Sequence, residues 1–133
     1  MKIITIKDAP LPAGHYSPAI KDGELLYISG QLPINQQTGS HCNGDIQAQA
    51  LQIFDNFNNI LTAAGTQKDQ VIKVTIYLTD ISEWDNVNTL YQQFFGNHRP
   101  VRSIVPVGPL HYGFRMEMEG IAKITRSGTG GDL

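Results

Sequence analysis

Two charged side chains are candidates for chemistry because they occur within apolar stretches typical of strands. Arg102 lies in PVRSIVPV, and Glu117 lies in RMEMEG. A guanidinium presents a planar fork of donors that fits a carboxylate, so Arg102 is a candidate anchor for an acidic substrate. A partly buried carboxylate can hold a water molecule and transfer protons. For an isolated arginine on a strand the alternative is a structural ion pair, here with Glu117 itself.

Sequence motifs for several other chemistries are absent. The sequence has no GxxxxGK[ST], GxGxxG, HExxH, CxxC or GxSxG segment, so nucleotide hydrolysis, dinucleotide cofactors, zinc proteolysis and thiol redox chemistry are not expected. The histidines stand in separate predicted loops without ligand spacing and are typical of solvated side chains: His15, His41, His98 and His111. Neither a cofactor nor a metal ion is predicted.

Length and charge narrow the class of protein. A chain of 133 residues is the size of one domain. Ten Lys+Arg against 12 Asp+Glu give a formal net charge of -2, so nucleic acid is not an expected partner. The single cysteine, Cys42, cannot form an internal disulfide, and no apolar run is long enough for a membrane span or a signal peptide. These features predict a cytoplasmic protein without a membrane partner.

Hydrophobic periodicity predicts the elements that position Arg102 and Glu117. Strands are expected at 2–6, 17–20, 25–29, 72–78, 101–107 and 114–124, with Asp22-Gly23 marking a hairpin turn. Apolar residues at steps of three and four predict helices over 45–64 and from about Ser82 to Gly96. The alternating residues of strand 72–78 predict an apolar face made of Ile72, Val74, Ile76 and Leu78. The glycine-rich tail, 127–133, is expected to be frayed.

These elements predict a single α+β domain over residues 1–133. Two helices can cover only one face of a mixed sheet of about six strands. Strand 101–107 carries apolar residues on both sides, which predicts that other subunits cover the second face. An oligomer follows from this pattern, but the number of subunits does not.

Five segments, in order along the chain, resemble the RidA (YjgF) family of reactive-intermediate deaminases. They are AGHYSPAI, ISGQLPINQQTG, ALQIFDNFNNILTAAG, IKVTIYLTDISEWDNVNTLYQQFFGNHRPVRSIVPV and MEMEGIAKI. The resemblance implies a chorismate mutase-like fold and a homotrimer with sites between subunits. It also implies cofactor-independent hydrolysis of 2-imino acids and enamines, such as 2-aminoacrylate, to 2-keto acids and ammonia.

The resemblance further implies roles for individual residues. Arg102 matches the family's arginine that binds the substrate carboxylate, and Glu117 matches the acid that positions water and handles protons. The other residues expected at the site are Tyr16, Ser29, Gly30, Asn88 and Ile104. Ile104 stands where many members have cysteine. Segment 108–114, with His111 and Tyr112, also departs from the family pattern, which we expect to affect substrate preference more than reaction type.

Three alternatives remain open at this stage. A non-catalytic trimer that binds small carboxylates needs Arg102 but not Glu117. Endoribonuclease activity, a label that some family members carry, is disfavoured by the acidic charge balance and the lack of a basic cluster. Deamination of other imines, including aminomuconate-type substrates, is compatible with the same residues.

Overall fold

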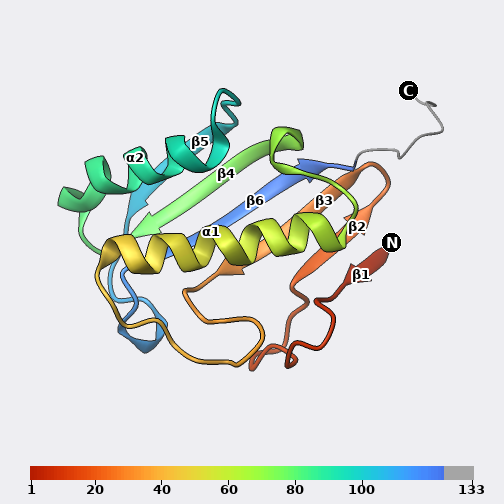
Figure 1. Ribbon diagram of the computed structural model, residues 1–133, viewed down its shortest axis with the longest axis horizontal. Coiled ribbons are helices and arrows are strands. Elements are labelled where there is room, and N and C mark those ends of the chain that lie inside the picture. The colour runs from red at the N-terminus through yellow and green to blue at the C-terminus, as the bar shows by residue number, and fades with distance from the viewer. Residues whose placement is uncertain (125–133) are drawn as a thin grey trace.

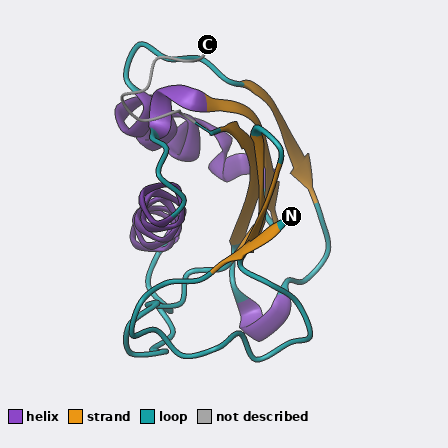
Figure 2. Ribbon diagram, turned by 90° about the vertical axis from the view of Figure 1, so that its right-hand side faces the viewer, coloured by secondary structure: helices purple, strands orange, loops and turns teal. Residues whose placement is uncertain are grey.

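The structure, a computed structural model, describes residues 1–124 and confirms the predicted α+β fold (Figure 1). The predicted frayed tail, 127–133, lies outside the described residues. One six-stranded mixed sheet is covered on one face by two helices (Figure 2). The elements are β1 (Lys2–Ile4), β2 (Ala19–Asp22), β3 (Leu25–Gln31), α1 (Ile46–Ala63), β4 (Val71–Leu78), α2 (Trp84–Phe95), β5 (Val101–Pro106) and β6 (Met116–Lys123).

The sheet has the order β1-β2-β3-β6-β4-β5. Strands β2 and β3 form the predicted hairpin, and Gly23 in its turn has a φ of 62°, which glycine adopts without strain. Strands β4 and β5 are the parallel pair, joined through α2. Such a connection needs a crossover element, and here the crossover places α2 over the β4–β5 end of the sheet (Figure 1).

Helix α1 forms as its apolar periodicity predicts. Asp45 caps its first turn, accepting a hydrogen bond from the backbone N–H of Ala48 at 2.9 Å. Its inward face is fully buried at Ile53, Phe57 and Ile60, which pack against the sheet. Burial of side chains of this size supplies most of the stabilisation of the helix, since each contributes about 1.5–3 kcal/mol.

The predicted start of the second helix is wrong by a few residues. Ser82 lies in a 3-10 turn, Ile81–Glu83, that precedes α2. Asp80 caps this turn, because its carboxylate accepts hydrogen bonds from the backbone N–H and the hydroxyl of Ser82. These hydrogen bonds lower the pKa of Asp80. From sequence spacing alone, a serine that donates a hydrogen bond to a preceding aspartate cannot be distinguished from a serine that caps a helix.

Strand β4 departs from the predicted alternation at one residue. Ile72 was expected on the apolar face, but it is exposed, and Val71 is buried in its place. The register with β6 shifts between Val71 and Lys73, so the strand changes phase there. Val74, Ile76 and Leu78 are fully buried, as predicted.

The face of the sheet opposite the helices carries no covering layer from the described residues (Figure 2). Apolar side chains are exposed on it, including Tyr27 at 45% and Val101 at 63% of their surface. We refer to it as the open face. Within residues 1–124, no helix is long and apolar enough to cross a membrane.

Candidate active site

Arg102 and Glu117 lie on opposite faces of the sheet. Arg102 is directly paired with Val74, which is fully buried beneath the helices. Glu117 is paired with Tyr77, three residues further along β4. Because side chains alternate along a strand, Arg102 faces the helices and Glu117 faces the open side. The ion pair between them that the sequence left open is therefore wrong.

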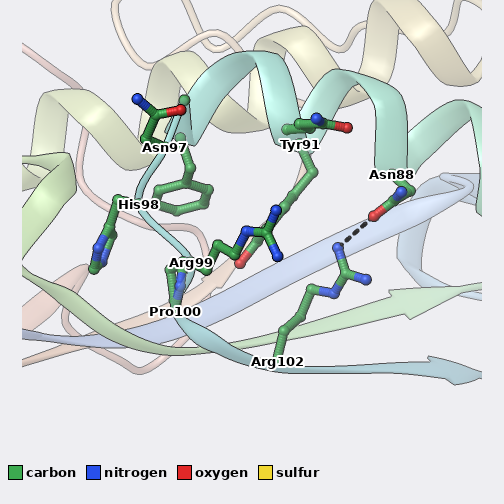
Figure 3. A pocket seen from close by; sticks show the side chains of 10 residues that line it. Asn88, Tyr91, Asn97, His98, Arg99, Pro100 and Arg102 are labelled. Atoms are coloured by element: carbon green, nitrogen blue, oxygen red, sulfur yellow. Dashed lines mark hydrogen bonds between the residues drawn. The ribbon is translucent and has the colours of Figure 1, made fainter.

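Arg102 lies in a groove between β5 and α2, the Arg102 groove, with a volume of about 550 Å³. Its Nη1 donates a hydrogen bond to Oδ1 of Asn88 at 2.9 Å (Figure 3). The guanidinium also lies 4.7 Å from the ring centroid of Tyr91 and 5.5 Å from that of Trp84. Two successive turns of α2 thus position the guanidinium while leaving part of its donor fork available to a ligand.

Tyr91 contributes a second polar group beside Arg102. Its side chain is buried, and its hydroxyl has no hydrogen-bond partner within residues 1–124. Burial raises the pKa of Tyr91 to about 12, against a smaller opposing effect of the Arg102 charge. A buried hydroxyl without a partner is rare, so this one is suited to a ligand, a water molecule or another chain.

Glu117 is positioned by a β-bulge on the neighbouring strand. Ile28 pairs with Gly120 and Gln31 with Met118, so Ser29 and Gly30 together oppose a single residue of β6. A β-carbon at Gly30 would collide with the Glu117 carboxylate, whose carboxyl carbon lies 2.9 Å from that position. Glycine therefore leaves room for the carboxylate in this position, and a β-carbon here would make the Glu117 side chain shift.

The electrostatic surroundings of Glu117 favour its neutral form. Burial raises the pKa of its carboxyl, and the charge of Glu119 adds to this effect. Glu119 is itself engaged with Tyr77, whose hydroxyl donates a hydrogen bond to it at 2.9 Å. A glutamate with a raised pKa takes up a proton more readily than an exposed glutamate, which suits it to a role as a general base.

Glu117, Tyr16, Ser29 and Gly30 line one pocket at the loop end of the sheet, the Glu117 pocket, with a volume of about 780 Å³. Tyr16 is half-exposed at its rim. The Ser29 hydroxyl donates to the backbone carbonyl of Ser17, so its proton is already used. What Ser29 can present to a ligand is therefore its backbone and the lone pairs of its hydroxyl.

The structure thus gathers the predicted site residues into two groups and leaves one apart. Arg102 and Asn88 line the Arg102 groove, while Tyr16, Ser29, Gly30 and Glu117 line the Glu117 pocket. Ile104 lines neither; it lies on the same face as Arg102 and packs against the core. Within the described chain, no group of three His, Cys, Asp or Glu side chains is arranged to hold a metal ion.

Sequence reasoning did not anticipate the positions of His41 and His98, whereas segment 108–114, with His111, was expected to affect substrate preference. His98 is half-buried, with Nε2 2.7 Å from the carbonyl of Val71. His41 and His111 come from loops 70 residues apart in sequence, yet both rings contact Tyr112 in the wall of the Glu117 pocket. In the sequence, the one sign of this part of the pocket was that segment 108–114 departs from the family pattern.

Comparisons with known proteins agree with this architecture. The family model described as Endoribonuclease L-PSP matches residues 6–124. A RutC family protein of Pyrococcus horikoshii is 42% identical over 121 residues, covering 91% of this chain and 96% of that protein. The 2-iminobutanoate/2-iminopropanoate deaminase of Bos taurus is 38% identical over 121 residues, covering 91% of this chain and 88% of that protein.

Solved structures give the same result. Escherichia coli TdcF with bound serine has a TM-score of 0.87 and 35% identity, covering 94% of this chain and all of that one. YyfA from Yersinia pestis, of the Rid protein family, has a TM-score of 0.88 and 40% identity, covering 92% of this chain and 98% of that one. Along nearly its whole length, this chain therefore belongs to the RidA (YjgF) family, whose family model bears the description Endoribonuclease L-PSP.

Proposed function

We propose that this protein is a 2-iminobutanoate/2-iminopropanoate deaminase that hydrolyses imine and enamine intermediates to 2-keto acids and ammonia. The observation that carries the proposal is the pairing of a half-buried glutamate of raised pKa with a glycine that leaves room for its carboxylate. The bovine relative is named for this reaction. The relative with bound serine holds a small molecule with an α-carboxylate, the group that Arg102 would bind.

In this mechanism Arg102 binds the substrate carboxylate. The guanidinium is aligned by Asn88 and by the face of Tyr91, so its free donors are fixed before the substrate arrives. Such positioning places the imine carbon in a defined spot and removes much of the entropic cost of the reaction. Arg102 is therefore an anchor and orienting group, with no proton to transfer.

Glu117 handles the protons. As a carboxylate it accepts a proton from water while the water oxygen forms a bond to the imine carbon. The protonated Glu117 then donates this proton to the nitrogen, which gives a carbinolamine. Glu117 next takes the proton of the carbinolamine hydroxyl and passes it to the same nitrogen, so that the C–N bond breaks, ammonia leaves and the oxygen forms the keto group. Burial and the Glu119 charge raise the pKa of Glu117, which makes its carboxylate a stronger base towards water than an exposed glutamate.

A complete site requires two chains in this proposal. Since Arg102 and Glu117 face opposite sides of one sheet, a second copy must bring its Arg102 groove to the Glu117 pocket of the first. A head-to-tail interface of this kind closes into a ring, and a homotrimer would carry three equivalent sites. The exposed apolar residues of the open face, including Tyr27 and Val101, are suited to burial in that ring.

The test couples the purified protein to a pyridoxal-phosphate dehydratase that releases 2-aminoacrylate from serine. Pyruvate formation should be faster with the wild-type protein than without it, and Arg102→Ala should remove the acceleration while leaving the folded oligomer intact. The oligomer is checked by sedimentation. Retained acceleration in the variant would refute the role of Arg102, and no acceleration by the wild type would refute the deaminase.

A binding-only role is separated from catalysis by Glu117→Gln. In a carboxylate-binding trimer this variant should hold 2-keto acids as the wild type does, since Arg102 remains. In a deaminase it should bind the keto acid but lose turnover. The endoribonuclease description of the family model adds one control, in which a labelled RNA is incubated with the same preparations; cleavage by the wild type alone would favour that activity.

A further inference from the structure

A row of aromatic rings lies along one wall of the Glu117 pocket. The ring centroid of Tyr112 lies 3.6 Å from that of His111 and 4.4 Å from that of His41. Phe114 is buried behind the row, 5.4 Å from His41 and 5.8 Å from Tyr112. His41, His111 and Tyr112 line the same pocket as Glu117, so a ligand bound there can reach them. We call these three residues the aromatic wall.

The backbone holds Tyr112 in a conformation that tyrosine seldom adopts. Its φ is 60° and its ψ is 14°, in the left-handed region, and Gly113 follows with a φ of 73°. Strained residues of this kind concentrate at ligand sites, where the surrounding structure enforces them. Here the conformation sets the phenol ring in the pocket wall, where 47% of the Tyr112 surface remains exposed.

The Glu117 pocket is larger than a three-carbon substrate needs, and most of its lining carries no charge. Its volume of about 780 Å³ lies in the range of pockets that enclose drug-sized ligands. Among the described residues that line it, Glu117 is the one with a formal charge at pH 7, His taken as neutral. The remaining lining includes Pro10, Pro12 and Pro18, which offer apolar surface without a hydrogen-bond donor. Away from Glu117 the lining is thus uncharged, combining this apolar surface with amides such as Asn35 and Gln36, and it is suited to an uncharged side chain.

The three loops that line the Glu117 pocket meet at one end of the sheet. Segment 5–18, segment 32–41 and segment 107–115 lie together at the lower end of the molecule in both views (Figures 1 and 2). Glu117 is the second residue of β6, two residues after the end of segment 107–115. The aromatic wall and Glu117 therefore line one pocket at the same end of the sheet.

We infer that the aromatic wall is a side-chain subsite and that this chain favours 2-imino acids with an aromatic side chain over those with a methyl group. The inference rests on the proposed function, because it extends the same site. Aromatic pairs in offset or edge-to-face contact are favourable beyond the area that they bury. A substrate ring would complete the row of His111, Tyr112 and His41, while a methyl group would leave it exposed to water.

The test compares imines formed in solution by an L-amino-acid oxidase from phenylalanine, leucine and alanine. Tyr112→Asn removes the ring and keeps a residue that tolerates positive φ, and His41→Ala removes the second ring. Each should lower kcat/KM for the phenylalanine imine about 3- to 10-fold, the size of one aromatic contact, and leave the alanine imine within about 2-fold. His15→Ala, an exposed loop histidine outside the pocket lining, is the matched control.

Two results would overturn the inference. One is an unchanged ratio of phenylalanine to alanine imine turnover in both variants. The other is an equal loss for the leucine imine, which would show an apolar pocket without preference for rings. If the wild type hydrolyses no imine, the proposed function fails. The subsite is then decided by calorimetry: tighter binding of phenylpyruvate than of pyruvate, lost in Tyr112→Asn, supports it, and equal binding refutes it.

Discussion

The Arg102 groove and the Glu117 pocket are built by different means. In the groove, regular elements do the positioning: β5 carries Arg102, and α2 presents Asn88 and Tyr91 to its guanidinium. In the pocket, a β-bulge positions the acid, because the bulge between Ile28 and Gln31 creates the space for the Glu117 carboxylate. The groove carries a fixed cation, and the pocket carries an acid whose pKa is raised by burial.

Neither region by itself contains both groups that the proposed reaction uses. Among the described residues, none that lines the Arg102 groove is acidic, and none that lines the Glu117 pocket is a lysine or an arginine. Under the proposed function, this division between two faces of the sheet would make activity depend on assembly of the subunits. Each variant below changes one of the two regions and leaves the other unchanged.

The largest effect is expected from mixing two inactive variants. Arg102→Ala and Glu117→Gln alone should each lose about 10²- to 10³-fold in kcat/KM, the loss typical of truncating one buried charged partner. When the two are unfolded together and refolded as mixed trimers, about a quarter of the sites should again combine both native residues in a ring of equal subunits. Dehydratase-coupled turnover measures the recovery.

A mixture that stays as inactive as its components would show that the two regions do not share a site. Separately refolded variants, combined only at the time of assay, serve as the control. They should show no recovery if subunits exchange slowly.

A smaller effect is expected from filling the space beside the carboxylate. Gly30→Ala would displace the Glu117 side chain, and a misplacement of about 1 Å can cost on the order of 10²-fold in rate. Gly108→Ala is the matched control, because a β-carbon there meets nothing within 4 Å. We expect kcat to fall in the first variant, with the midpoint of thermal unfolding nearly unchanged in both. An unaffected kcat in Gly30→Ala would exclude a role for the carboxylate position.

A moderate effect is expected from releasing the guanidinium. Asn88→Ala removes the 2.9 Å hydrogen bond to Arg102, which we expect to raise KM about 3- to 10-fold because Arg102 stays charged but loses its alignment. Asn86→Ala, exposed on the same helix, is the control. Steady-state kinetics separate KM from kcat. A fall in kcat alone would place Asn88 in the chemical step and contradict its role as a positioning residue.

The smallest expected effect is a shift in the pH dependence of kcat/KM, which reports on the Glu117 pocket. Activity requires the carboxylate form, so kcat/KM should rise with pH through a pKa above the ordinary range of glutamate. Glu119→Gln removes the second cause of this shift and should move the rise to lower pH, while burial, the larger cause, keeps it raised. A profile unchanged by Glu119→Gln would show that the Glu119 charge does not act on Glu117.

The same shift predicts a change in stability. The folded protein binds the Glu117 proton more tightly than the unfolded chain does, so this contribution is fully present below the unfolded pKa and is lost as pH rises through the folded pKa. Glu117→Gln has no such proton to lose. Its free energy of unfolding should therefore improve relative to the wild type as pH rises towards neutral, as measured by urea unfolding at a series of pH values. A difference independent of pH would contradict the raised pKa.

Much of the fold followed from local patterns. Periods of two and of three to four residues predicted every strand and both helices, because burying one face of each element dominates its stability. The errors occurred where tertiary pairing changed the local phase, as at Ile72 and Ser82. Hydrophobic periodicity in the sequence does not predict the register shift in β4 or the 3-10 turn before α2.

The identities of Arg102, Glu117, Gly30 and Asn88 as candidates came from the sequence, through their residue types and a family resemblance. The sequence alone determined the two-layer α+β fold and the chemical groups available, since composition and periodicity act through neighbouring residues. Only the tertiary structure decided that Arg102 and Glu117 face opposite ways and that His41 meets Tyr112. The face of the sheet on which a side chain lies depends on how its strand pairs with neighbouring strands. Contacts between loops depend on which distant segments of the chain the fold brings to the same end of the sheet.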